Sequence, residues 1–274
     1  MGIVLDAGLC QTTVMLYASL ASGSRGNCHA ISDGERILLI DAGISFLQIR
    51  NRLNSLNWRL DQVQGVAVTH EHSDHINAIP VILRKTNWPI LATPGTLEAI
   101  ETIKGIEVPK SRWIPLAAGR DASWEGWTLY PFAVPHDTAD PVAYRLEATG
   151  FVLAVITDTG YPTALAIEYS KDLDLLVLES NHDIDMLREG SYPPELKARI
   201  LSRVGHLSND ACAEMLGKII SPKLKHVVLA HLSEQNNEPA LARLASSSVI
   251  SRAGSGAALH VATQSEVLEI RNAV

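Results

Sequence analysis

Short apolar runs rich in Val, Ile and Leu recur along most of the chain, and each has the length of a buried β-strand. These runs are Ile37–Ile40, Gly65–Thr69, Ile90–Ala92, Phe151–Ile156, Leu173–Leu178 and His226–Ala230. A further strand is expected to begin at Met15 and continue to Leu20. Because amphipathic, helix-like stretches lie between several of these runs, the pattern predicts an α/β sandwich whose sheet edges present loops on one side.

Two of the helix-like stretches carry clear start signals. Thr93 and Pro94 precede the stretch 95–103, as an N-cap and a proline in the first turn of a helix would. The stretch 208–220 begins with Ser208, a good capping residue, and stops before Pro222. Both segments are therefore predicted to be helices that connect strands.

The region from Trp113 to Leu146 has a different pattern. Turn residues and aromatic residues alternate there, as they do in antiparallel strands. No low-complexity tract, repeat or linker interrupts the chain, so we predict a single domain spanning residues 1–274. Residues 1–14 carry little pattern and are either an extension before a natural start at Met15 or an ordered extra strand.

Composition narrows the class of protein. Hydrophobic residues make up 46% of the chain and charged residues 19%, which is typical of a folded globular protein. No apolar run approaches the roughly 18–20 residues that span a membrane, and no secretory signal is recognisable, so no membrane partner is expected. The cysteines Cys10, Cys28 and Cys212 are too scattered for a disulfide framework or a CxxC zinc site. We therefore expect a cytoplasmic location.

The net charge of −7 argues against a protein that coats nucleic acid, because non-specific affinity comes largely from Lys and Arg. It leaves room for an enzyme that grips phosphate locally, since bound divalent cations would be the largest charges in such a site. Charge alone therefore leaves the substrate open.

The strongest chemical signal is a cluster of histidines and an aspartate that follows the predicted strand Gly65–Thr69. The cluster consists of His70, His72, Asp74 and His75. Imidazoles suit borderline divalent cations, and carboxylates add oxygen ligands that offset the metal charge. A polar loop that is rich in histidine by chance is the plain alternative, but so many buried polar groups would need partners. The pattern favours a metal site.

The spacing HxHxDH after a buried strand resembles the signature of the metallo-β-lactamase-fold superfamily. That pattern continues with a lone His, an Asp and a late His, each on a loop after a strand, and His136, Asp158 and His231 stand in those places here. The resemblance implies a four-layer αββα sandwich. The segments 19–27, 41–43, 179–183 and 205–209 are similar to those of the YycJ/WalJ-like branch, whose members are associated with DNA exonuclease activity.

The same resemblance implies a ligand set for two divalent cations. His70, His72 and His136 would bind the first cation, Asp74, His75 and His231 the second, and Asp158 would bridge both. Zinc is the first expectation, and manganese, iron and nickel suit the same donors. Asp41 is expected to support the site, for example by a hydrogen bond to a ligand histidine.

Further candidates lie outside the ligand set. Asp74, His182 and His206 are the predicted catalytic residues, and either histidine is a candidate general acid or phosphate ligand, with a structural role as the alternative. The candidate substrate-binding residues are Ser22, Ser24, Asn27, Asn181 and Arg199. The loop 22–27 is as well explained by a simple turn as by an anion cradle. Lys197, Arg199 and Arg203 could contact a phosphate backbone or could be ordinary exposed helix charges.

The expected function is that of a two-metal hydrolase that uses a metal-bound hydroxide. A phosphodiesterase acting on DNA ends is the first choice. The alternative is a hydrolase of a small substrate such as a cyclic phosphodiester, lactone, thioester or β-lactam. An iron-based oxidoreductase on this fold would tend to carry a carboxylate where His72 stands, and a non-catalytic binding module would be expected to have lost ligands.

Overall fold

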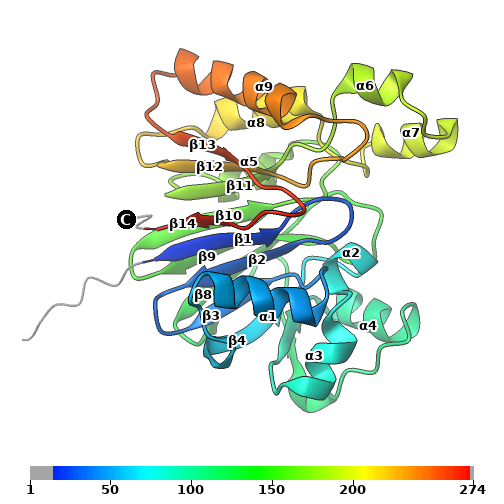
Figure 1. Ribbon diagram of the computed structural model, residues 1–274, viewed down its shortest axis with the longest axis vertical. Helices are drawn as coiled ribbons and strands as arrows, with labels where there is room; N and C mark the ends of the chain where they lie inside the picture. The colour runs from blue at the N-terminus through cyan, green and yellow to red at the C-terminus, as the bar shows by residue number, and fades with distance from the viewer. Residues whose placement is uncertain (1–14, 272–274) are drawn as a thin grey trace, which may run out of the picture.

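Two seven-stranded sheets lie face to face in the middle of the structure, and helices cover both outer faces (Figure 1). The computed structural model describes residues 15–271, so both interpretations of residues 1–14 lie outside the described residues. The strand order is β14-β1-β2-β3-β4-β5-β6 in the first sheet and β13-β12-β11-β10-β9-β8-β7 in the second. The layers confirm the predicted αββα sandwich.

The strands of the first sheet are β1 (Leu16–Ala21), β2 (Cys28–Ser32), β3 (Ile37–Ile40), β4 (Val63–Ala67), β5 (Ile90–Ala92), β6 (Trp113–Pro115) and β14 (Leu268–Ile270). Those of the second sheet are β7 (Ala122–Trp124), β8 (Trp127–Ala133), β9 (Val142–Ala148), β10 (Phe151–Ile156), β11 (Leu175–Glu179), β12 (His226–Ala230) and β13 (Ala258–Val261). All the apolar runs identified in the sequence form strands, with ends shifted by at most a few residues. Strands β3, β10 and β11 are buried along their whole length because helices and the opposite sheet cover their two faces.

Each sheet combines a parallel half with an antiparallel half. Strands β3 to β6 run parallel, and so do β10 to β13, whereas the other neighbours pair antiparallel. The prediction of antiparallel strands between Trp113 and Leu146 is right for β7, β8 and β9. It is wrong for β6, which pairs in parallel with β5. A strand of three residues is too short for its alternation to identify its partner.

The helices are α1 (Phe46–Ser55), α2 (Ser73–Ile76), α3 (Ile79–Lys85), α4 (Pro94–Thr102), α5 (Ala164–Tyr169), α6 (Ile184–Glu189), α7 (Pro194–Ile200), α8 (Asn209–Ile219) and α9 (Pro239–Arg252), with single 3₁₀ turns at Leu60–Gln62 and Lys110–Arg112. The predicted caps are present, since the hydroxyls of Thr93 and Ser208 accept hydrogen bonds from the first turns of α4 and α8. The longest helix, α9, has 14 residues. Within residues 15–271 no helix combines the length and apolar character that a membrane crossing requires.

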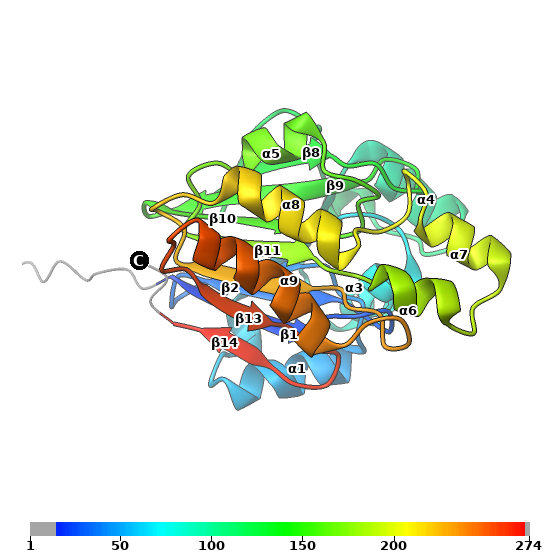
Figure 2. The same cartoon turned by 90° about the horizontal axis from the view of Figure 1, so that it is seen from above.

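Three apolar cores fill the spaces between the four layers. One joins the outer face of the first sheet to α1, α3 and α4, and another joins the outer face of the second sheet to α5, α8 and α9. The third lies between the sheets. Helices α6 and α7 stand apart from this packing, beyond the same end of the sheets where α2 lies (Figures 1 and 2). That end holds the polar clusters predicted from the sequence.

Candidate metal centre

Loops from both sheets meet at this end of the sandwich. The segment from His70 to His75 follows β4 in the first sheet, and α2 forms its second half. In the second sheet, His136 follows β8, Asp158 follows β10, and His231 follows β12. Strands β8 and β10 run in the same direction because both pair antiparallel with β9. Because these strands run in the same direction, the loops that follow them lie at the same end of the sheet, as is typical of sites in α/β sheets.

Three residues at these strand ends have left-handed backbone conformations. The φ angle is +62° at Asp41 after β3, +56° at Asp158 after β10 and +56° at His231 after β12. Such angles are uncommon for residues other than glycine and persist only where the surrounding structure enforces them. Each one turns the chain sharply at a strand end, and its side chain lies against the cluster.

All seven predicted ligand residues come together. His70, His72 and His136 can direct one ligand atom each to a common point, and Asp74, His75 and His231 form a second such group, with ligand atoms within 4.8 Å of one another in each. Asp158 lies between them. Its Oδ2 is 3.2 Å from His75 Nε2, and its Oδ1 is 3.4 Å from His231 Nε2 and 3.7 Å from His136 Nε2. The seven residues thus lie together as two groups with the Asp158 carboxylate between them, and their roles as ligands stay a prediction.

The chemistry of the donors suits divalent cations. Burial, together with His136, lowers the pKa of His72 to about 4, and burial also lowers the pKa of His136. These imidazoles are therefore neutral near pH 7, as metal ligands must be. Within residues 15–271, the buried atoms His70 Nε2, Asp158 Oδ2 and His231 Nε2 form no hydrogen bond. Buried polar atoms that converge without hydrogen bonds are the pattern expected of ligand atoms directed at a cation.

Opposite charges dominate the second group. Burial by itself lowers the pKa of His231, but Asp158, Asp74 and Glu179 outweigh burial and raise that pKa to about 10. In His75 the same competition raises the pKa well above its usual value, because Asp158, Asp41 and Asp74 surround the ring. The protein therefore concentrates carboxylates where positive charge is to be held.

Asp41 holds the first-sheet candidate residues in place through hydrogen bonds. His75 Nδ1 donates to Asp41 Oδ2 over 2.7 Å, and the backbone N–H of Thr69 donates to Asp41 Oδ1 over 2.8 Å. Gly43 allows the loops to approach, since a Cβ atom at this position would lie 1.6 Å from the carbonyl oxygen of Asp74. The backbone N–H of Asn27 donates to that same oxygen. These contacts fix the orientation of the segment that contains Asp74 and His75.

The sequence reasoning assigned no role to Glu179, which is fully buried at the end of β11. His206 Nδ1 donates to Glu179 Oε1 over 2.7 Å, and the backbone N–H of Thr159 donates to Oε2 over 2.8 Å. Burial raises the pKa of this carboxyl group, but His206 and His231 outweigh it and bring the pKa to about 2. A glutamate at the end of an otherwise apolar strand was the signal that could have identified it.

A cavity of about 200 Å³ opens onto the cluster. Its walls consist of Ser24, His72, Asp74, Asp158, Asn181, Tyr192, Leu196, Arg199, Ile200, His206, His231 and Ser233. The sequence did not single out Tyr192, Leu196, Ile200 and Ser233. Leu196 and Ile200 lie on α7, so this helix supplies an apolar wall opposite the polar cluster.

The other candidate residues divide into two sets. Ser24, Asn181, Arg199 and His206 line the cavity. Ser22 and Asn27 are buried behind it, where the Ser22 hydroxyl accepts a 2.7 Å hydrogen bond from the His231 backbone N–H. His182 is also buried and is absent from the cavity wall. Arg199 bonds Asp137, which follows His136, through Nε (2.5 Å) and Nη2 (3.1 Å).

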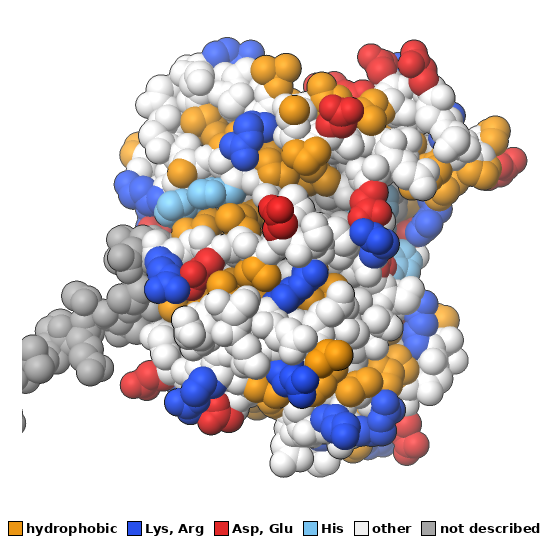
Figure 3. Space-filling view, viewed as in Figure 1, with side chains coloured by type: hydrophobic (Ala, Val, Ile, Leu, Met, Phe, Trp, Pro, Cys, Tyr) orange, Lys and Arg blue, Asp and Glu red, His pale blue; other side chains and the backbone are white. Residues whose placement is uncertain are grey.

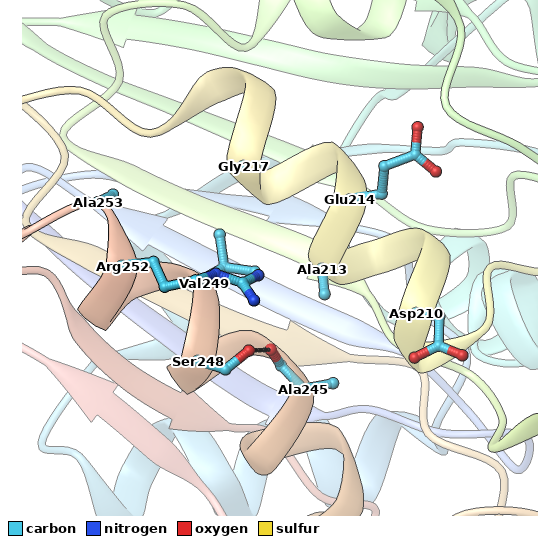
Figure 4. Close-up of a pocket in the computed structure, with 9 residues that line it drawn as sticks. All are labelled: Asp210, Ala213, Glu214, Gly217, Ala245, Ser248, Val249, Arg252 and Ala253. Carbon is cyan, nitrogen blue, oxygen red and sulfur yellow. Dashed lines mark hydrogen bonds between the residues drawn. The ribbon is translucent and has the colours of Figure 1, made fainter.

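A larger cavity of about 650 Å³ lies away from this cluster, between α8 and α9 (Figure 4). Small side chains line most of it, with Asp210 and Glu214 on α8 and Arg252 on α9. Ser248 uses its hydroxyl internally, on the carbonyl of Ala245. The groove contains none of the clustered histidines, so the smaller cavity is the candidate site.

Comparison with known proteins shows the family to which the chain is similar. Residues 36–232 match the family described as Beta-lactamase superfamily domain. The chain is 38% identical to exodeoxyribonuclease YycJ of Bacillus anthracis over 88% of this chain and 90% of the relative. It is 35% identical to exodeoxyribonuclease WalJ of Streptococcus pneumoniae over 83% of this chain and 85% of the relative.

Among solved structures, the metallo-β-lactamase fold protein YhfI from Bacillus subtilis is similar to this one. The TM-score is 0.70, the similarity covers 94% of this chain and 100% of YhfI, and the sequence identity is 16%. At this identity the likeness concerns the fold alone. It agrees with the two stacked sheets and the helices on their outer faces.

Proposed function

The chain belongs to the metallo-β-lactamase superfamily and is a metal-dependent hydrolase of that fold, and on this premise we propose that it removes nucleotides from the ends of DNA. The similarity to two proteins named exodeoxyribonucleases, which covers most of the chain, supports DNA as the substrate. The observation that carries the proposal is the cavity wall, where the clustered ligand residues, a histidine paired with a buried glutamate, and an arginine face the same space.

We assign the ligand positions to the residues that converge in the structure. His70, His72 and His136 would hold one cation, Asp74, His75 and His231 the other, and Asp158 would contact both. When bound there, a pair of divalent cations supplies Lewis acidity toward a phosphate and lowers the pKa of water toward neutrality. Zinc suits this donor set best, and manganese, iron and nickel are the other candidates.

His206 is the proposed general acid. Its Nδ1 donates to Glu179, which orients the ring, so Nε2 is the nitrogen left to deliver a proton. The ring lines the cavity, and its Nδ1 is 3.5 Å from Asp158 Oδ1, which places it beside the ligand cluster. From this position His206 would protonate the leaving oxygen of a cleaved phosphodiester. His182 lies outside the cavity wall and is the weaker candidate.

Phosphate binding falls to the remaining polar residues of the cavity wall. Arg199 is the cationic side chain there, and its bonds to Asp137 hold the guanidinium beside the loop of His136. Ser24 and Asn181 add a hydroxyl and an amide as hydrogen-bond donors. These groups would hold the phosphate of a terminal nucleotide while His206 faces its leaving oxygen.

The charge of the chain is compatible with such local contact. On the face shown in Figure 3, the basic side chains (blue) and the acidic side chains (red) of the described residues are interspersed. A long nucleic-acid footprint would require a continuous basic surface, whereas an enzyme that holds a chain end needs few phosphate contacts. We therefore expect the affinity for DNA to fall only gradually as the salt concentration rises.

The size of the cavity supports a second candidate function. A volume of about 200 Å³ is small enough for a compact substrate such as a cyclic phosphodiester, lactone, thioester or β-lactam. The same clustered ligands and the same general acid would serve these substrates. The relatives' names do not favour this alternative.

The direct test incubates the purified protein with manganese or zinc and end-labelled single-stranded or double-stranded DNA. The expected result is metal-dependent release of nucleotides from an end, which EDTA abolishes. His72→Ala should lose the activity, whereas Arg252→Ala in the distant groove between α8 and α9 should keep it. If DNA remains intact while bis-p-nitrophenyl phosphate, nitrocefin or a thioester is hydrolysed, the small-substrate alternative replaces the proposal.

A further inference from the structure

Two loops meet at the rim of the candidate site. One follows Asp158 and includes Gly160, and the other follows α7 and ends at Gly205. The backbone N–H of Gly160 donates to the carbonyl of Pro135, and His136 Nδ1 donates to the carbonyl of Gly205 over 3.2 Å. A Cβ atom on Gly160 would lie 2.3 Å from the carbonyl carbon of Arg203. The two loops therefore touch each other and border the ligand His136.

At this junction the guanidinium of Arg203 stacks on the ring of Tyr161. The guanidinium carbon is 4.0 Å from the ring centroid. Arg203 is exposed, and Tyr161 is partly exposed. Within residues 15–271, the side chain of Arg203 forms no ion pair or hydrogen bond, unlike Arg199, which is paired with Asp137, and Arg25, which is paired with Glu234. Its N–H groups are therefore free to contact an external anion.

The surroundings of this pair are apolar and locally basic. Leu201 is 46% exposed and Val204 is 41% exposed, and they are two of only six large hydrophobic side chains so exposed in the described part of the chain. Between residues 193 and 205 the chain carries Lys197, Arg199 and Arg203 against Glu195 alone, a local charge of three minus one, or +2, in a protein of net charge −7. The exposed apolar side chains of Leu201 and Val204 therefore lie beside one guanidinium, that of Arg203, which has no ion-pair partner among the described residues, and such a surface is suited to contact another molecule.

We propose that Tyr161, Leu201, Arg203 and Val204 form a rim platform that binds the single-stranded segment of DNA next to the nucleotide held in the cavity. This inference rests on the proposed function and adds a substrate preference to it. Bases stack on aromatic and guanidinium planes, and cations beside them contact the backbone, which is how proteins hold single strands without sequence preference. The rim platform therefore favours substrates with an unpaired end over blunt duplexes.

Because the cavity is small, DNA must also contact the protein surface outside the cavity. Its volume of about 200 Å³ is below the roughly 300 Å³ at which pockets for drug-sized ligands begin, so a DNA chain must extend beyond it. The rim platform is the adjoining surface where the described residues offer a partly exposed ring stacked with an unpaired arginine. A blunt duplex end offers only the outer face of its last base pair, because the faces of all other bases are covered within the helix, whereas an unpaired segment offers several bases for stacking.

The test measures binding separately from cleavage. Fluorescence anisotropy of a short fluorescein-labelled oligothymidylate, recorded in EDTA, reports affinity without turnover. Tyr161→Ala and Arg203→Ala should each weaken binding roughly tenfold, and Arg203→Ala should also flatten the salt dependence by about 0.7 in log–log slope. Tyr161→Phe keeps the ring and should bind like the wild type, while Arg203→Lys should lie between wild type and alanine. Arg252→Ala is the matched control for loss of one surface cation.

Cleavage kinetics then distinguish this inference from the proposed function. For Tyr161→Ala, KM for the oligonucleotide should rise about tenfold more than KM for bis-p-nitrophenyl phosphate, which carries no adjoining DNA segment to occupy the rim platform. Equal changes for both substrates, or alanine variants that bind the oligonucleotide as Arg252→Ala does, would overturn the rim platform even if the enzyme is an exonuclease. Oligonucleotide binding that depends on Tyr161 and Arg203, with no cleavage by the wild type, would retain the platform and reject the exonuclease activity.

Discussion

The two sheets supply the candidate metal centre in different ways. The first-sheet half consists of His70, His72, Asp74 and His75, which lie within six residues on one loop and the short helix α2. The second-sheet half consists of His136, Asp158 and His231, which come from three loops far apart in the sequence. Two of these three, Asp158 and His231, have left-handed backbone angles.

The difference shows what positions the side chains in each half of the centre. In the first half the covalent chain sets the spacing, and Asp41 and Gly43 only need to hold one segment in place. In the second half the register of neighbouring strands places each residue, and left-handed backbone angles turn Asp158 and His231 toward the cluster. The second half therefore depends more on long-range packing.

The largest expected effect comes from removing the residue that connects the halves. Asp158→Ala should lose both cations and lower activity by roughly 10³-fold or more, because both groups use this carboxylate. His72→Ala should lose activity to a similar degree and retain about one cation. Metal content by mass spectrometry, measured with activity, checks this. An Asp158→Ala protein that keeps two cations would show that the halves bind independently.

The second prediction concerns the close approach of the loops. Gly43→Ala should lower the free energy of unfolding by about 3 kcal/mol, because the added methyl meets the Asp74 carbonyl at 1.6 Å. Gly160→Ala in the second half should cost less, since the clash with Arg203 is at 2.3 Å. Gly256→Ala, with no atom within 4 Å of its Cβ, is the control. Denaturant unfolding measures all three, and equal stability of Gly43→Ala and Gly256→Ala would contradict the structure.

The third prediction compares the carboxylates behind the two halves. Asp41→Asn should weaken metal binding roughly 10- to 100-fold, because His75 loses its anionic hydrogen-bond acceptor. Glu179→Gln should lower kcat and shift the pH profile of kcat, because His206 loses its 2.7 Å carboxylate partner. It should weaken metal binding less than Asp41→Asn, because Glu179 Oε1 is 3.4 Å from His231 Nδ1, whereas Asp41 Oδ2 is 2.7 Å from His75 Nδ1. Metal titration and pH-dependent kinetics separate the two effects. Identical behaviour of the two variants would remove the distinction between them.

The smallest expected effect concerns a contact between the halves. Ser22→Ala should cost about 1–2 kcal/mol of stability, because the buried backbone N–H of His231 loses its 2.7 Å hydrogen bond. Ser24→Ala, two residues away and exposed at the cavity, should leave stability unchanged. Urea unfolding midpoints compare the two. A larger loss of stability in Ser24→Ala than in Ser22→Ala would contradict the stabilising role given to the hydrogen bond between Ser22 and His231.

Much of this protein is determined by local sequence. The apolar runs form strands because burial on both faces requires uninterrupted Val, Ile and Leu, and Thr93 and Ser208 cap helices through contacts only a few residues long. The histidines between positions 70 and 75 are neighbours in the chain, so their proximity needs no tertiary information. Asp158 and His231 could be proposed only because their motif order resembles a known family.

Tertiary structure alone decided the remaining features. It paired the short strand β6 in parallel with β5, buried Ser22 and Asn27 while leaving Ser24 on the cavity, and brought Glu179 to His206. It also stacked Arg203 on Tyr161 across two loops. Such contacts join residues that are distant in the chain, so they depend on strand register and loop packing. Composition and periodicity describe only the neighbourhood of each residue, and that is why they could not predict these contacts.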